Sequence, residues 1–275
     1  MIRDITLGQF FPGSSVIHKL DPRMKLIIMI AFVVGLFLAK TDTAYAFCLL
    51  CTVLLVAISR IRLSVIIKGM KPIVFVVLLT AVFNLFLVKG EGEPLLDWWI
   101  ISIYAEGVAY AVMMAVRIVC IITGTSVLLT YTTSPIALTD GLERLLSPLK
   151  KIKVPVHDFS MMMTMALRFI PTLVEETDKI MNAQKARGAS FSTGGLIKRA
   201  KALIPVMIPL FISSFHRAEE LATAMECRCY RGDVGRTRMT RLKTAPRDWL
   251  ALLAVALFCA ATVIISNFVS PIFIF

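Results

Sequence analysis

The sequence predicts an all-α membrane protein with about five transmembrane helices and a three-helix cytoplasmic domain inserted before the last of them. Two observations lead to this fold class. The 275 residues are 57% hydrophobic, with a mean hydropathy of +0.80, which is more apolar than a soluble domain of this length. The apolar residues also gather in runs that are long enough, or nearly so, to cross a bilayer core of about 30 Å.

Five apolar runs are the candidate spans. They cover residues 26–39, 44–58, 73–88, 108–131 and 249–269. The first run is short for a complete crossing, so we expect Lys25 to lie at the membrane boundary with its side chain extended toward water. Residues 95–104 contain Trp98 and Trp99, which suits a segment at the membrane interface.

Basic residues orient these spans, because lysine and arginine collect in cytoplasmic loops. The N-terminal tail and the loop after the second run are rich in them: Arg3, Lys19, Arg23 and Lys25, then Arg60, Arg62, Lys68 and Lys71. The loops after the first and third runs hold one each, Lys40 and Lys89. The pattern predicts a cytoplasmic N-terminus, and the fifth crossing then leaves the C-terminus outside.

This division predicts three parts. Residues 1–131 hold the N-terminal tail and spans one to four, residues 132–247 form the cytoplasmic block, and residues 248–275 form the last span. Within the cytoplasmic block the sequence predicts three helices, near residues 137–149, 156–188 and from 197 or 203 to 230. The two long helices each begin apolar and end charged, so we expect apolar halves against the membrane part and polar ends that protrude.

Two arginines stand between small residues at the ends of these long helices, in Ala186-Arg187-Gly188 and Cys227-Arg228-Cys229. Small neighbours leave the guanidinium uncovered, and its planar, permanently charged fork suits a carboxylate on a partner surface. A cation also suits a helix C-terminus, so a single triplet could do no more than cap its own helix. Two triplets at matching helix ends favour docking.

Further segments extend the pattern over nearly the whole chain: 11–25, 168–171, 227–232 and 235–238. Together with the triplets they resemble the transmembrane T component of energy-coupling factor (ECF) transporters, the cobalt/vitamin uptake permease family. Cys227 and Cys229 depart from that family, in which alanine and glycine are common there. Both cysteines are small, so we expect the docking role to survive.

The resemblance implies a transmembrane coupling subunit of an ECF-type ABC importer in a bacterial cell (inner) membrane. Two ABC-type ATPases would dock on this coupling domain, one on each arginine triplet. A small membrane protein, the substrate-capture (S) component, would bind a vitamin or other micronutrient. Closure of the ATPases would move the coupling helices and topple the capture protein to release substrate inside. The chain itself would be non-catalytic and would need no cofactor.

Four further residues are candidate functional residues, and each of them could instead have a structural role. Arg117 lies near the middle of the fourth span, and an intramembrane charge is a candidate functional residue by default; it could equally form a structural pair inside the bundle. Pro171, Pro205 and Pro209 would bend the coupling helices, either as hinges or as static kinks.

Other functional classes of protein fit this sequence less well. The sequence has no G-x-x-x-x-G-K-[ST] motif, so this chain is not the ATPase, and no set of polar residues marks a membrane enzyme. The formal charge of +12 is explained by cytoplasmic loops rather than by nucleic acid. His18, His157 and His216 lack metal-ligand spacing. An ordinary ABC importer permease, a dedicated cobalt or nickel ECF permease and a shared vitamin-type module remain open, with residues 231–238 favouring the last.

Overall fold

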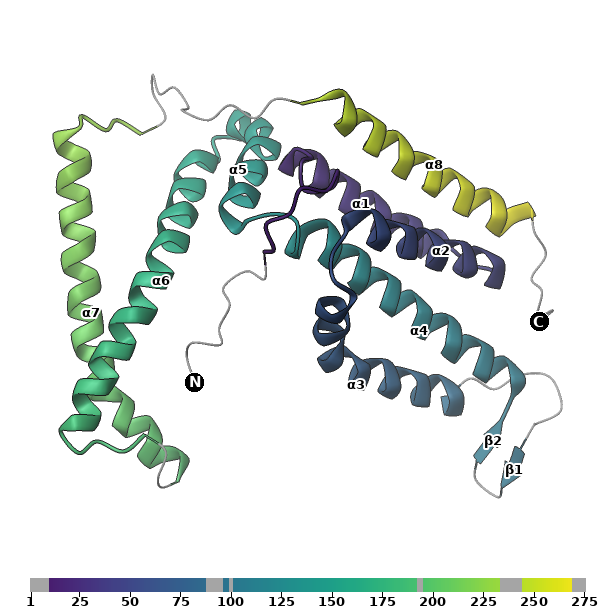
Figure 1. Cartoon of the computed structure of the whole chain (residues 1–275), viewed down its shortest axis with the longest axis horizontal. Helices are drawn as coiled ribbons and strands as arrows, with labels where there is room; N and C mark the ends of the chain where they lie inside the picture. Colours follow the sequence, from purple (N-terminus) through teal and green to yellow (C-terminus); the bar gives the residue numbers. More distant parts are fainter. Residues whose placement is uncertain (1–9, 88–95, 99–100, 192–194, 233–243, 269–275) are drawn as a thin grey trace. The chain divides into compact units, whose positions relative to one another are not determined.

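The computed structural model describes residues 10–87, 96–98, 101–191, 195–232 and 244–268 (Figure 1). The chain separates into two compact units. The bundle unit is drawn from residues 8–141 and 242–275, and the arm unit from residues 142–241. One region of the resemblance, residues 235–238, lies outside the described residues.

The bundle unit consists of long apolar helices. They are α1 (Pro22–Leu38), α2 (Asp42–Ser59), α3 (Leu63–Leu87), α4 (Ala105–Thr125) with a π-helical continuation to Thr130, and α8 (Pro246–Phe268). By length and composition, four of these helices can cross a membrane: α2, α3, α4 with its continuation, and α8. The remaining expected span is α1, which has 17 residues and is about 26 Å long. The all-α membrane fold is therefore confirmed with four candidate spans, and a crossing by α1 stays a prediction.

Between α3 and α4 the chain forms a small hairpin. Strand β1 (Leu96–Trp98) pairs antiparallel with β2 (Ile101–Ile103), and Leu96 lies opposite Ile103. This segment was expected to lie at the membrane interface, and that location stays a prediction. Trp99 lies outside the described residues.

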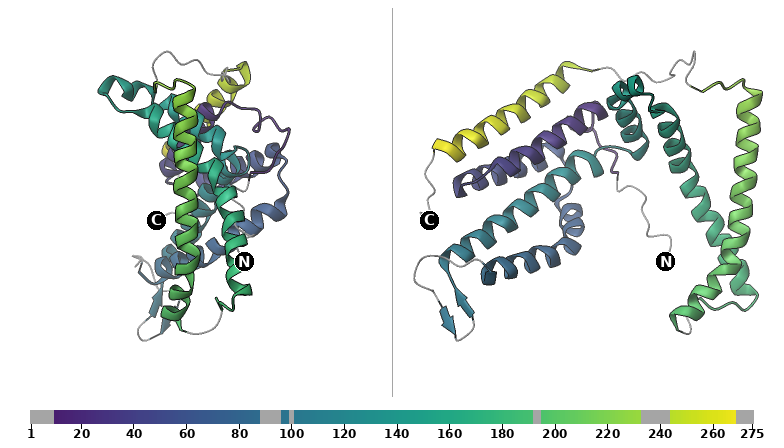
Figure 2. Two further views of the ribbon diagram at one scale, coloured as in Figure 1. Left: turned by 90° about the vertical axis from the view of Figure 1, so that its left-hand side faces the viewer. Right: turned by 180° about the vertical axis from the view of Figure 1, so that it is seen from behind.

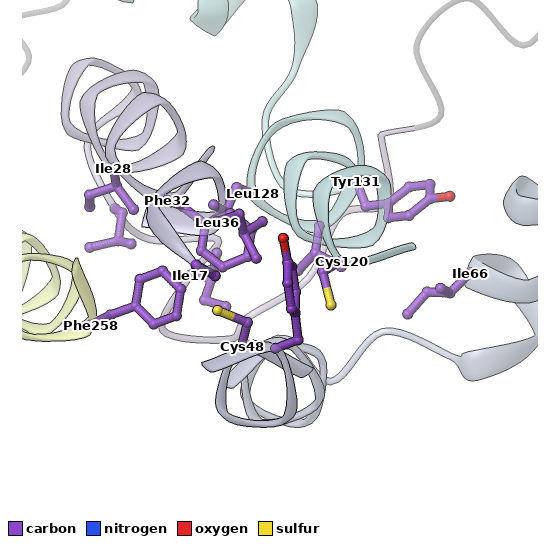
Figure 3. Close-up of a cluster of buried hydrophobic side chains, with 14 of the residues drawn as sticks. Ile17, Ile28, Phe32, Leu36, Cys48, Ile66, Cys120, Leu128, Tyr131 and Phe258 are labelled. Carbon is purple, nitrogen blue, oxygen red and sulfur yellow. The ribbon is translucent and has the colours of Figure 1, made fainter. Parts of the chain in front are cut away.

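The core of the bundle unit lies among α1, α2, α4 and α8 (Figure 3). Phe258 of α8 stacks on Phe32 of α1, with ring centroids 5.4 Å apart. Gly124 of α4 permits this packing, because a Cβ there would overlap the Phe32 ring. Cys48 is fully buried in the same cluster, where a free thiol packs as a small hydrophobe.

The start of α1 is fixed by buried polar groups, and here the expectation for Lys25 was wrong. Its side chain is 1% exposed, and its ammonium donates to the Thr132 carbonyl at 2.8 Å and to the Thr133 hydroxyl at 3.1 Å. The Asp248 carboxylate accepts the backbone N–H of Asp21 at 3.0 Å. The turn between the π-helical segment and α5 thus supplies the polar partners of Lys25 that the sequence led us to seek in water.

The arm unit is built on two long helices, α6 (Val156–Ala186) and α7 (Leu196–Cys227). Tyr230, just after α7, donates to Met161 near the start of α6, at 2.9 Å. Glu176 in the middle of α6 contacts Ser213 in the middle of α7. The helices therefore run antiparallel, and Figures 1 and 2 show that they cross.

The predicted helix at 137–149 is divided into two elements. The first, α5 (Pro135–Leu145), is followed by a 3₁₀ helix over Ser147–Ile152. Pro148 explains the break, because proline cannot donate a helical hydrogen bond and disfavours helical geometry in the residue before it. The His157 imidazole then lies 3.0 Å from the buried Glu143 carboxylate, which ties the start of α6 to the last turns of α5.

Candidate docking site at the ends of the two long helices

The first triplet closes α6 with a left-handed cap. Ala186 is the last helical residue, Arg187 is the C-cap, and Gly188 has φ +88°. The N–H of Gly188 donates to Lys185 O at 2.9 Å, and the N–H of Ala189 donates to Gln184 O at 3.0 Å. This pair of bonds is the Schellman arrangement, in which glycine supplies the left-handed residue at no steric cost.

The second triplet closes α7 in the same way. Cys227 ends the helix, Arg228 is the C-cap, and Cys229 has φ +54°. The N–H of Cys229 donates to Glu226 O at 2.9 Å, and that of Tyr230 donates to Met225 O at 3.1 Å. The C-cap dihedrals also agree, with φ −83° and ψ 8° at Arg187 against φ −91° and ψ 12° at Arg228. The two triplets are therefore equivalent in backbone as well as in sequence.

All six residues of the triplets are exposed. Within the described part of the chain, neither Arg187 nor Arg228 has an ion pair or a side-chain hydrogen bond. The backbone closes both helices without help from the guanidinium groups, which remain available to a partner. A solvent-facing guanidinium with no internal partner can bind a carboxylate through two parallel hydrogen bonds.

The antiparallel arrangement places the two triplets at opposite ends of the α6–α7 pair. The helices have 31 and 32 residues, so each is about 45 Å long. The sequence predicted polar ends that protrude, and the polar ends of α6 and α7 face opposite ways. This separation suits two partners, each engaging one triplet.

Both long helices expose apolar side chains, on α6 near its start and on α7 up to just past its middle. On α7 these are Leu203, Ile204, Met207, Ile208, Phe211, Ile212 and Phe215, and on α6 they are Phe159, Met162 and Met163. A hollow of about 240 Å³ is lined by Phe211, Ile212, Phe215, His216 and Glu219. Contiguous exposed apolar surface of this kind marks a protein or membrane contact.

A polar contact that the sequence reasoning missed joins the two helices. The Ser213 hydroxyl donates to one oxygen of Glu176 at 2.5 Å, and the Arg217 guanidinium donates to the other at 2.6 Å. The Ser213 hydroxyl first, and then Arg217, lower the pKa of Glu176. No sequence signal pairs these residues, because they lie 37 and 41 positions apart.

The three candidate hinge prolines lie inside continuous helices, Pro171 in α6 and Pro205 and Pro209 in α7. Each removes a helical donor and frees the carbonyl four residues earlier. Pro209 frees the carbonyl of Pro205, so the two breaks in α7 are one turn apart. Whether they act as hinges stays a prediction.

Arg117 contacts the end of α1, the start of α2 and the turn between them. Its guanidinium donates to the carbonyl of Ala39 at 3.3 Å and to the hydroxyl of Tyr45. Its Cζ lies 5.5 Å from the Phe37 ring centroid and 5.2 Å from that of Tyr45, which is within the range of cation–π attraction. These contacts lie within the bundle unit and are remote in sequence from both triplets.

Several known proteins that are similar to this chain share one name. Residues 13–241 match the family model CbiQ, described as cobalt transport protein. A protein of Clostridium kluyveri is 54% identical over 260 residues, which cover 94% of this chain and 96% of that protein. One from Thermosediminibacter oceani is 48% identical over 98% of this chain and 100% of its own length, and one from Bacillus subtilis is 44% identical over 94% and 97%. All three are named energy-coupling factor transporter transmembrane protein EcfT.

Proposed function

Because this chain belongs to the CbiQ/EcfT family of transmembrane proteins of energy-coupling factor transporters, we propose that it is the non-catalytic subunit that couples two ABC-type ATPases to a substrate-capture membrane protein. Four span-length helices agree with its place as a membrane component of a transporter. We further propose that the N-terminus and the arm unit lie in the cytoplasm of a bacterial cell, as the basic loops predict.

One observation carries the proposal: two arginine triplets with the same cap geometry at opposite ends of one antiparallel helix pair. We assign each triplet to one ATPase, where Arg187 or Arg228 would bind a carboxylate. A guanidinium whose backbone is already fixed loses little freedom on docking, which supports tight and oriented binding. The apolar first halves of α6 and α7 would then contact the capture protein.

In this mechanism the chain transmits motion and performs no covalent step. Closure of the ATPases would move the two ends of the α6–α7 pair relative to each other. Pro205 and Pro209 would concentrate bending in one stretch of α7, because hydrogen bonds are missing there. The Glu176–Ser213–Arg217 contact would keep the helices together at their centre while the ends move.

The names of the relatives favour an ECF-type coupling subunit over an ordinary ABC importer permease. We propose uptake of a vitamin or another micronutrient. The description of the matching family model as cobalt transport protein favours a second candidate, a subunit dedicated to cobalt or nickel. Purifying the complex from cells that express several capture proteins separates the two: a shared module would bring down more than one of them.

The docking assignment is tested by co-expression with the two ATPases and purification through a tag on one of them. Arg187→Glu plus Arg228→Glu would place like charges against the proposed carboxylates, which costs more than loss of the pair alone. We expect recovery of the doubly changed chain to fall by about 100-fold or more. The control is Lys198→Glu plus Lys201→Glu, the same charge change at exposed residues near the start of α7.

Membrane insertion of each variant is measured separately, so that a loss of docking is distinguished from a loss of the protein. If the arginine variant co-purifies as well as the unchanged chain, the triplets are helix ends and nothing more. Arg187→Glu and Arg228→Glu are also made singly. If each of them loses a different ATPase, the assignment of one triplet to each partner is supported.

A further inference from the structure

A hollow in the bundle unit lies beside the end of α2. Its volume is about 520 Å³, and it is lined by two segments: Ser14, Ser15 and Val16 before α1, and Leu54, Ala57, Ile58 and Arg60 at the end of α2. The lining is apolar along α2, where Leu54 and Ile58 are 54% and 46% exposed. It becomes polar at Ser14 and Arg60. The hollow is thus amphipathic, and it lies at the end of a helix that is long and apolar enough to cross a membrane.

The wall before α1 is held in place by internal contacts. The His18 ring lies 2.7 Å from the Ser15 hydroxyl through Nδ1 and 3.0 Å from the Phe11 carbonyl through Nε2. The neighbouring Ile17 is 7% exposed and belongs to the bundle core. This wall therefore keeps its shape without a ligand.

Arg60 occupies a backbone position that favours glycine. It is the C-cap of α2 and has φ +55°, with its N–H donating to Ala57 O at 3.3 Å. An L-residue other than glycine, asparagine or aspartate is disfavoured in this conformation. The presence of arginine there suggests that its side chain is used, beyond any favourable contact with the C-terminal end of the helix dipole.

Arg60 is the charged residue in the lining of the hollow, and further basic residues follow it in the sequence. Residues 43–87 contain no aspartate or glutamate, and Arg62, Lys68 and Lys71 follow Arg60 within eleven positions. All four basic side chains are exposed. In the portion of the chain that the structure covers, none of the four has an ion pair. An anion is therefore the complementary ligand.

We propose that this hollow binds one anionic phospholipid. Its phosphate would accept hydrogen bonds from Arg60 and from the Ser14 hydroxyl, while an acyl chain would lie along Val16, Leu54 and Ile58. A free phosphate would leave the apolar wall unfilled, and a zwitterionic lipid would bring a cation toward Arg60. The site requires only that the bundle unit lie in a membrane, and it is independent of the docking of ATPases.

The test uses the full chain purified in a neutral detergent, with the bound lipid counted by native mass spectrometry. Dioleoyl phosphatidylglycerol and dioleoyl phosphatidylcholine are added in separate titrations. We expect phosphatidylglycerol to bind about fivefold more tightly, a preference in the range of one basic residue near an anionic lipid surface. The variant Arg60→Gly should abolish this preference, and Leu54→Ser should weaken the binding of both lipids.

Arg60→Gly is the preferred variant because glycine relieves the left-handed backbone, so the protein should be at least as stable as the unchanged chain. Lys40→Gln is the matched control, since Lys40 is exposed in the turn between α1 and α2; it should keep the preference.

The proposal fails if both lipids bind equally to the unchanged chain, or if Arg60→Gly and Lys40→Gln have equal effects. It also fails if glycerol phosphate competes as strongly as phosphatidylglycerol, because the site would then recognise phosphate alone. None of these outcomes bears on recovery of the ATPases, so the two proposals can fail separately.

Discussion

The bundle unit and the arm unit use long helices in different ways. In the bundle, helices from both ends of the sequence share one core that extends from Ile17 to Phe258. In the described part of the arm, α6 and α7 bury few side chains, chiefly Val156, His157, Ser160 and Val206. The bundle is therefore held by its own packing, whereas the arm presents most of its surface outward.

This difference indicates which property a substitution should change in each unit. A fully buried side chain contributes through packing density and through the cavity that its removal leaves. An exposed apolar side chain contributes little to the chain alone but much to a contact with a partner. Substitutions should therefore affect stability in the bundle and assembly in the arm.

The largest expected difference is in the free energy of unfolding when one of two phenylalanines is replaced. Phe258 is 8% exposed in the bundle core, and Phe211 on α7 is 64% exposed. Phe258→Ala should lower the free energy of unfolding by about 3 kcal/mol, because it leaves a cavity between α1, α2 and α8. Phe211→Ala should change it by less than about 0.5 kcal/mol. Unfolding in mixed micelles, followed by tryptophan fluorescence, measures both, and equal losses would contradict the comparison.

The next effect concerns the buried carboxylate at the start of α8. Asp248 accepts N–H groups from Asp21 at 3.0 Å and from Ala245 at 2.6 Å. Asp248→Asn replaces one acceptor with a donor, so one N–H loses its partner and the bundle should lose about 1–3 kcal/mol. The same unfolding measurement applies, with Asp158→Asn in the first turn of α6 as the control for the arm. An unchanged transition for Asp248→Asn would show that the contact does not stabilise the bundle.

A smaller effect tests whether the two triplets are equivalent. Gly188 and Cys229 hold the same left-handed position, and no atom lies within 4 Å of a Cβ built at Gly188. Gly188→Ala should therefore destabilise the end of α6 by about 1 kcal/mol through backbone strain alone. Cys229→Gly should stabilise the end of α7 by a similar amount. Hydrogen exchange of the last helical amides follows both, and changes of the same sign would refute the equivalence.

The smallest effect concerns the contact between the middles of α6 and α7. Ser213 and Arg217 lower the pKa of Glu176 below its ordinary value of 4.5. The contact therefore stabilises the arm above about pH 4.5, and this contribution is lost as the pH falls through the lowered pKa. Glu176→Gln should remove that pH dependence from hydrogen exchange in α6, whereas the exposed Glu220→Gln should retain it. An identical pH profile for the two variants would exclude the contact as the cause.

Much of this architecture could be predicted from local sequence. The apolar runs predicted the helices of the bundle, because a stretch of about 20 apolar residues has few alternatives to a membrane helix. The arginine triplets predicted the ends of α6 and α7 closely. The break at Pro148 was visible in the sequence, but it was interpreted as the end of one helix rather than as the start of a 3₁₀ turn.

The environment of Lys25 could not be predicted in this way. A lysine at the edge of an apolar run commonly extends toward water. Its partners Thr132 and Thr133 are more than 100 residues away, and no local rule places them beside α1. Asp248 was missed for the same reason, since its partner Asp21 is 227 positions distant.

The sequence by itself determined the class of the protein, the order of its helices and the residues that end the two long ones, because hydropathy and helix capping act over a few turns. Only the tertiary structure decided that α6 and α7 run antiparallel, that their arginines lie at opposite ends, and that Lys25 and Asp248 are buried. Those features depend on contacts between segments far apart in the chain, which helix-forming tendency and periodicity do not encode.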